Sequence, residues 1–171
     1  LKAAQDRLAF DEIFLLQLGV LGQRRAWQDR SARVFNIEPE WLDEQASQLP
    51  YSLTAAQQRA LHDLRHDLAS GQPMNRLLQG DVGSGKTIVA ALTIAMVARE
   101  GAQAALMAPT SILAEQHYRS LVKLLATQPQ IASMGDASAI PPAVLDESNI
   151  RLMIGATPET EKQQIRAGLA D

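Results

Sequence analysis

The chain contains 171 residues, of which 46 % are hydrophobic and 20 % charged, so it can form a buried core and wholesale disorder is excluded. It has no cysteine, which excludes disulfides and thiolate metal sites, and its 16 Lys and Arg against 19 Asp and Glu lack the basic excess of a self-sufficient nucleic-acid binder. The sequence shows no membrane-length apolar run and no signal-peptide pattern, which predicts a cytoplasmic protein without membrane association.

Residues 1–50 are predicted to form a helical linker. Within residues 6–25, apolar side chains recur near helical spacing, at Leu8, Phe14, Leu15, Leu18 and Leu21. Arg24 and Arg25 follow in the last turn, where cations favour the helix dipole. The apolar stripe is wide, so this helix is expected to pack against another surface. Residues 26–50 indicate a short helix between connectors.

From residue 51 onward, helices alternate with short apolar segments. Helices are expected within 53–71 and at 86–100 and 111–126, and strands at 76–79, 102–109 and 150–155. Thr54 is the expected N-cap of the first helix, and Gly71 and Gly101 follow the ends of the first two. A helix after each strand predicts a parallel sheet covered by helices, an α/β fold.

The segment 127–149 interrupts this alternation. It is rich in Ser, Ala, Pro, Gln and Asp, and is predicted to be a long mobile insertion. After the strand at 150–155, a final helix is expected with Thr157 as N-cap and Pro158 at its first position.

Residues 80–87, GDVGSGKT, fit the phosphate-loop pattern G-x-x-x-x-G-K-[ST] at every fixed position. The glycines let backbone N–H groups converge on phosphate oxygens, and the following helix directs its N-terminal N–H groups at the same anion. Lys86 is expected to reach the β- and γ-phosphates, and the Thr87 hydroxyl to hold Mg²⁺, which makes both candidate catalytic residues. The candidate nucleotide-binding residues of this loop are Gly80, Asp81, Val82, Gly83, Ser84, Gly85, Lys86 and Thr87. The alternative is a glycine-rich turn that binds nothing; the apolar segments on both sides favour nucleotide binding.

Gln57, in LTAAQ (53–57), allows two interpretations. Thr54 and Gln57 have the spacing of a capping box, in which each side chain satisfies the other residue's backbone N–H. A carboxamide can also donate to and accept from an adenine edge. One amide cannot fully serve both roles, and the residues by themselves favour the cap.

The segment 108–121, APTSILAEQHYRSL, places Pro109 and Thr110 after an apolar strand and before a helix. N–H groups and a hydroxyl at such a helix start can contact an anion, for which a nucleic-acid phosphate is one candidate. A simple helix cap is the alternative. The end of a strand beside the phosphate loop is where ligands collect in open α/β sheets.

Three phrases carry a family resemblance: LPYSLTAAQQRAL, MNRLLQGDVGSGKTIVAALTIAMVAREGAQAALMAPTSILAEQH and RLAFDEIFLLQLGVLGQRR. They resemble the bacterial RecG-type ATP-dependent DNA helicases of superfamily 2. The resemblance implies a partial RecA-like phosphate-loop domain, the N-terminal part of motor lobe 1, over residues 51–171. Residues 1–50 would then be the linker between the wedge domain and the motor.

The resemblance also implies roles for individual residues. Gln57 matches the adenine-contacting glutamine, and Pro109, Thr110 and Gln116 match a motif that holds the DNA backbone. After the third strand, where the family usually has Thr-Gly-Ser, this chain reads Ile154, Gly155, Ala156 and Thr157. The segment MGDAS (134–138) is a rival match, so further DNA contacts are not assigned.

A motor of this kind also needs a strand that ends in Asp-Glu to support Mg²⁺ and to orient the attacking water. The candidate here is AVLDES (143–148), but Pro141 and Pro142 precede it, which favours a solvated loop over a central strand. We therefore expect Asp146 and Glu147 not to be the hydrolytic pair. The start at Leu1 and the lack of the acidic motif suggest a fragment without the wedge domain and the second motor lobe.

The sequence thus predicts the ATP-binding part of a translocase that remodels branched double-stranded DNA, such as stalled forks and junctions, in repair and recombination. The intact protein would be a monomer, and this chain is expected to bind ATP weakly without hydrolysing it. Two alternatives remain: a transcription-repair coupling translocase, or a self-contained small phosphate-loop NTPase or kinase. A non-catalytic binding piece is a further possibility. His62, His66 and His117 do not form a metal set.

Overall fold

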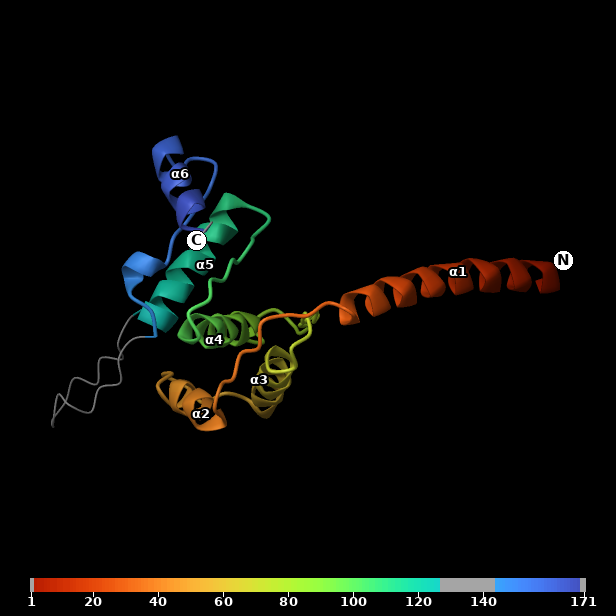
Figure 1. The fold of residues 1–171 in the computed structure, drawn as a ribbon, viewed down its shortest axis with the longest axis horizontal. Helices are drawn as coiled ribbons and strands as arrows, with labels where there is room; N and C mark the ends of the chain where they lie inside the picture. Colours follow the sequence, from red (N-terminus) through yellow and green to blue (C-terminus); the bar gives the residue numbers. More distant parts are fainter. Residues whose placement is uncertain (1, 127–143, 170–171) are drawn as a thin grey trace.

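A computed structural model describes residues 2–126 and 144–169 (Figure 1). Its α-helices are α1 (Lys2–Gln28), α2 (Pro39–Ser47), α3 (Ala55–Leu68), α4 (Lys86–Arg99), α5 (Ser111–Leu121) and α6 (Glu159–Gly168). A π-helical turn, η1 (Val122–Ala126), continues α5, and a short 3₁₀ helix, η3 (Glu147–Asn149), precedes residue 150. The predicted insertion falls largely outside the described residues, since 127–143 are not among them.

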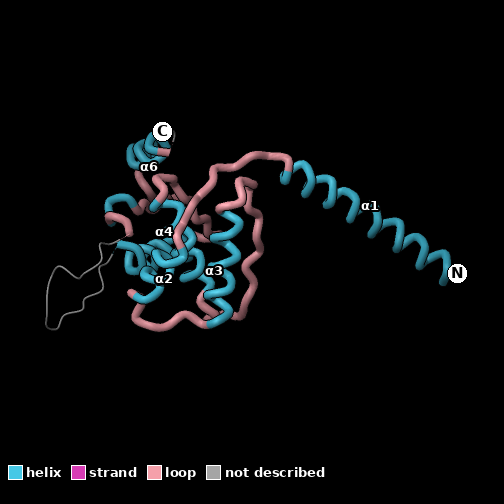
Figure 2. The backbone as a smooth tube through the Cα atoms, turned by 60° about the horizontal axis from the view of Figure 1, so that its bottom comes forward, coloured by secondary structure: helices cyan, strands magenta, loops and turns pink. Residues whose placement is uncertain are grey.

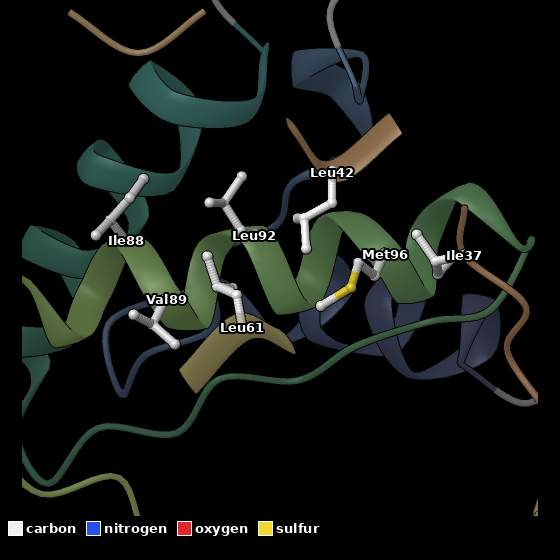
Figure 3. Packing of buried hydrophobic residues seen from close by; sticks show 7 residues of the cluster. All are labelled: Ile37, Leu42, Leu61, Ile88, Val89, Leu92 and Met96. Atoms are coloured by element: carbon white, nitrogen blue, oxygen red, sulfur yellow. The ribbon is translucent and has the colours of Figure 1, made fainter. Parts of the chain in front are cut away.

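Helix α4 is the centre of the described core. It packs against α2, α3, α5 and η1, so it is covered on several sides. Its sequence is apolar around most of its circumference, the pattern expected of a helix enclosed by others. Ala91, Ala95 and Met96 are fully buried. Figure 3 shows the larger core cluster along α4, formed by Ile37, Leu42, Leu61, Ile88, Val89, Leu92 and Met96.

Helix α3 begins and ends as the sequence predicts. Thr54 is its N-cap, and a complete capping box joins Thr54 to Gln57. Gly71 follows the helix at φ +72°, a backbone conformation that an L side chain rarely adopts. These local signals are strong because they satisfy backbone groups that the helix ends leave unpaired.

The connector between α1 and α2 is tied to the core. Its backbone donates to the carbonyls of Leu68 and Gly71, from Phe35 and Ala32 at 3.0 and 2.8 Å, respectively. Ile37 then enters the same core cluster as Leu42 of α2. At the far end of α4, Arg99 lies over the Trp41 ring at 4.8 Å and pairs with Glu38 at 3.1 Å. Residues 29–49 therefore pack as part of this body.

Helix α1 projects away from the body formed by the other helices (Figures 1 and 2). Phe10 and Phe14 stack on one another, with ring centroids 6.1 Å apart, and both rings are more than half exposed. Over the described chain, this helix does not meet the packing surface that its apolar stripe predicts. None of the described helices combines the length and the hydropathy needed to cross a lipid bilayer.

The three predicted strands are not formed within the described residues, where Figure 2 shows helices and loops. Segments 76–79, 102–109 and 150–155 have no regular secondary structure. A β-strand forms only when its backbone N–H and C=O groups pair with those of a neighbouring strand. No backbone hydrogen bond joins these three described segments to one another. Leu77 and Met107 are accordingly 88 % and 91 % exposed. The parallel sheet stays a prediction.

The start of α6 differs from the predicted start, in which Thr157 is the N-cap. The helix begins at Glu159 with Pro158 in the N-cap position, one residue later than expected. Thr157 instead closes a turn, since its hydroxyl accepts from the Ile154 N–H at 3.0 Å and its own N–H donates to the Ile154 carbonyl at 3.2 Å. A turn that satisfies both groups competes with the N-cap role.

Candidate nucleotide-binding site

The segment 80–87 forms a tight turn that leads directly into α4. Gly83 and Gly85 have φ angles of +82° and +79°, and Gly85 is the N-cap of α4. The Ser84 N–H donates to the Asp81 carbonyl at 3.1 Å, which closes the turn. Positive φ at both glycines is the reason that these positions exclude other residue types. The loop therefore opens a 14-residue helix whose first N–H groups lack helical partners.

Two glycines also have side chains close to where a Cβ atom would lie. A Cβ atom at Gly80 would lie 2.7 Å from the Ser84 hydroxyl oxygen. A Cβ atom at Gly85 would overlap the Gln57 side-chain nitrogen. The loop is exposed, so its backbone can be approached from solvent. Such a compact, exposed turn of backbone N–H groups before a helix fits a nucleotide phosphate.

Lys86 folds back over this loop. Its Nζ donates to the carbonyls of Gly80 and Asp81, both at 2.8 Å. The side chain is half-buried and so is that of Thr87, the next residue of the first turn. The ammonium group is thus held at the loop, for which the sequence predicts a contact with the β- and γ-phosphates.

Gln57 joins the start of α3 to the phosphate loop. Its Oε1 accepts from the Thr54 N–H at 2.8 Å, and its N–H donates to the Thr54 hydroxyl at 3.3 Å, so the predicted cap is present. Its Nε2 donates to the Ser84 carbonyl at 2.9 Å, a contact that the sequence did not predict. Each amide atom keeps a second hydrogen-bonding capacity, so the side chain can still meet an adenine edge.

Thr110 is the N-cap of α5, and its hydroxyl accepts from the Leu113 N–H at 3.3 Å. The cap considered from the sequence is therefore present. Pro109, Thr110 and Gln116 are all exposed, on the segment that leads into α5 and on α5 itself. The structure leaves these side chains accessible to a ligand from solvent.

Asp146 and Glu147 are not at the end of a strand, as the preceding prolines predict: Asp146 precedes the short 3₁₀ helix η3 and Glu147 begins it. The Asp146 carboxylate accepts from the Ser148 N–H at 2.7 Å and caps η3. Its hydrogen bonds with Ser148 hold the pKa of Asp146 below the usual aspartate value. Over the described part of the chain, no three His, Cys, Asp or Glu side chains are grouped as metal ligands would be.

The loop that opens α4, with its lysine and threonine, places the chain among the phosphate-loop proteins in which helicases are found. The chain belongs to the DEAD/DEAH box helicase family, whose family model matches residues 54–165. This match spans both the phosphate loop and the Thr110 segment.

Within this class, the similar proteins are RecG helicases, which confirms the resemblance inferred from the sequence. The chain is 41 % identical over 169 residues to the ATP-dependent DNA helicase RecG of Thermotoga maritima, covering 99 % of this chain and 19 % of that protein. It is 50 % identical over 123 residues to the RecG of a Synechocystis species, covering 71 % of this chain and 15 % of the relative. The chain thus spans a fifth or less of the length of these relatives.

A solved structure, of RecG bound to a three-way DNA junction, has the same fold. It superposes with a TM-score of 0.71 at 39 % identity, over 97 % of this chain and 20 % of that one. This similarity supports the RecA-like helicase fold expected from the sequence, but not the individual strands of its sheet. These matches do not favour a transcription-repair coupling translocase or a small self-contained NTPase.

Proposed function

We propose that the chain is the ATP-binding part of a DNA helicase that remodels branched double-stranded DNA, such as stalled forks and junctions, in repair and recombination. The observation that carries this proposal is the loop at 80–87, with its two positive-φ glycines and its folded-back lysine, in a chain 41 % identical to a RecG helicase over 169 residues. The intact protein would work in the cytoplasm as a monomer, with a wedge domain and a second motor lobe.

The ligand of the loop in this proposal is ATP with Mg²⁺. Lys86 would transfer its hydrogen bonds from the Gly80 and Asp81 carbonyls to the β- and γ-phosphate oxygens, where its charge is complementary. The Thr87 hydroxyl would hold the metal ion, which supplies charge neutralisation at the phosphates when bound. The remaining candidate residues, Gly80, Asp81, Val82, Gly83, Ser84 and Gly85, would surround the phosphates with backbone N–H groups.

Gln57 would contact the adenine edge with the second hydrogen of Nε2 and the second lone pair of Oε1. Pro109, Thr110 and Gln116 would contact the DNA backbone, since their exposed segment leads into the N-terminus of an α-helix. The described residues offer no hydrolytic Asp-Glu pair at a strand end, because Asp146 is engaged as a cap. We therefore expect this chain to bind nucleotide without turning it over.

Titration with a fluorescent ADP analogue and Mg²⁺ measures the affinity of the loop for nucleotide. Lys86→Ala should weaken binding at least tenfold, because charge-assisted hydrogen bonds to phosphate are lost, at about 1.5–3 kcal/mol each. Lys123→Ala, at an exposed lysine of η1, is the matched control and should bind as the parent chain does.

ATP turnover is then measured with a branched DNA. Binding that depends on Lys86, without turnover, supports the proposal. Nucleotide affinity that is equal in the parent chain and Lys86→Ala would contradict it, and so would Lys86-dependent turnover by this chain, which would return Asp146 and Glu147 to the catalytic candidates.

A further inference from the structure

A groove whose lining residues do not include the phosphate loop lies between the end of α1 and the segment that follows α3. Its volume is about 560 Å³, within the range of about 300–1,000 Å³ typical of small-molecule sites. One wall is the last two turns of α1, and the other is the segment 70–76. Gln57, which contacts the loop, lies at the start of α3, and the segment 70–76 follows the end of that helix. Arg76 of the groove is four residues before Gly80 of the loop, a stretch that spans at most about 14 Å.

Side chains with free hydrogen-bonding groups converge on this groove. Four of them are carboxamides: Gln23, Gln28, Gln72 and Asn75. Within the described chain, none of these four side chains has a hydrogen-bond partner, and Arg24 forms no ion pair. Carboxamides donate and accept side by side, which is the pattern that matches the edge of a nucleobase.

The groove also offers an aromatic face beside these amides. Trp27 lines it and is 43 % exposed, although tryptophan is one of the most buried residue types on average. Pro73 and Met74 add apolar surface on the facing wall. A partly exposed indole can serve as a stacking platform for an unpaired base.

The wall that faces α1 is fixed by an ion pair. Arg76 donates to both carboxylate oxygens of Asp67, with a distance of 2.9 Å between its Nη2 and Oδ1. This pair neutralises the acidic group of the groove, so the charge left unpaired there is that of Arg24. The net field of the groove is therefore suited to an anionic backbone next to a base.

We propose that this groove binds an unpaired nucleotide of a single nucleic-acid strand, with the base against Trp27, its edge on the carboxamides and its phosphate at Arg24. The site goes beyond the nucleotide-binding function proposed above, and it does not depend on Lys86. It gives the chain a second place to hold a strand, at the opposite end of α3 from the phosphate loop.

The test uses the full chain with Trp41→Phe, so that Trp27 is the only tryptophan, and with Lys86→Ala to weaken phosphate-loop binding. A short oligothymidylate should quench Trp27 emission, and the labelled strand should gain anisotropy over the same concentration range. Trp27→Ala should raise the Kd about tenfold, the usual effect of losing one base–aromatic stack, and Trp27→Phe should restore most of the affinity.

Arg24→Gln should weaken binding and lower the slope of log K against log salt by about one, as the loss of one phosphate contact does. Arg25→Gln, in the same helical turn but outside the groove, is the matched control and should keep the parent slope. Equal effects of the two arginine substitutions, or unchanged Trp27 emission at saturation, would overturn the proposal. Quenching by thymidine monophosphate as strong as by the strand would assign the groove to free nucleotides, and displacement by an acidic peptide but not by unlabelled strand would assign it to a polypeptide.

Discussion

At the scale of single residues, Gln57 combines the helix cap that the sequence predicts with a contact to the phosphate loop that it does not. Its Oε1 completes the cap of α3, and its Nε2 holds the Ser84 carbonyl of the phosphate loop. The side chain also occupies the space that a Cβ at Gly85 would need. Gln57 is therefore placed to position the loop, in addition to any contact with adenine.

This position leads to a prediction about base selectivity. Gln57→Ala should lower the affinity for a fluorescent GDP analogue as well as for an ADP analogue, because the loop that holds the shared phosphates loses its support. The loss should be larger for the ADP analogue, because the proposed adenine contact is removed as well. Thr54→Ala, which removes the other half of the capping box, is the control for the cost of the cap, about 1 kcal/mol of stability. A loss confined to the adenine nucleotide would show that Gln57 acts through the base alone.

Asp67 provides a prediction about pH. Its hydrogen bond with Arg76 is the main cause that lowers the pKa of Asp67 below its usual value. A carboxyl whose pKa is lower in the folded state stabilises the fold above the unfolded-state pKa of about 3.9, and this contribution is lost as the pH falls through the folded-state pKa.

Urea unfolding of the parent chain and of Asp67→Asn, followed from pH 7 to pH 3, measures this contribution. The parent should be the more stable at neutral pH, and the two free energies of unfolding should converge as the acid limit is approached. Asp43→Asn, at an exposed position of α2, should give a curve parallel to that of the parent. A gap between parent and Asp67→Asn that stays constant with pH would refute the linkage.

At the scale of elements, the helices were predictable because their signals are local. The cap at Thr54 and the glycine at position 71 mark the ends of α3 within a few residues of sequence. The contact between Gln57 and Ser84 spans 27 positions and leaves no periodic signal. Strands at 76–79 and 102–109 could not be predicted reliably for the same reason. An apolar run can enter a sheet, but the neighbouring strand that it must pair with lies elsewhere in the sequence.

The core around α4 gives the prediction at this scale. Leu61 of α3 is 2 % exposed and belongs to the cluster in Figure 3, so Leu61→Ala should cost about 2–5 kcal/mol of unfolding free energy. Leu77→Ala, the same substitution at a side chain that is 88 % exposed, should change it by no more than about 0.5 kcal/mol. Denaturant unfolding compares the two, and equal losses would contradict the assignment of the core to α4 and its neighbours.

At the scale of the whole molecule, the two proposed binding regions lie near opposite ends of α3. The phosphate loop opens α4, and the groove lined by Trp27 lies at the other end of α3. The phosphate loop was predictable from eight consecutive residues, whereas the groove joins residues near position 25 with residues near position 75. No sequence pattern marks such a groove, because its side chains meet only after α1 and α3 have been placed.

The placement of α4 has a mechanical consequence. Its first residue follows Gly85 of the loop, and at its other end Arg99 rests on Trp41 and pairs with Glu38, about 20 Å away at 1.5 Å per residue. Close-packed interiors transmit displacement rather than absorb it. A movement of the loop that tilts the first turn of α4 would therefore also displace Arg99 at the other end of the helix. That displacement would reach Trp41 of α2 and Glu38 of the connector that leads back to α1.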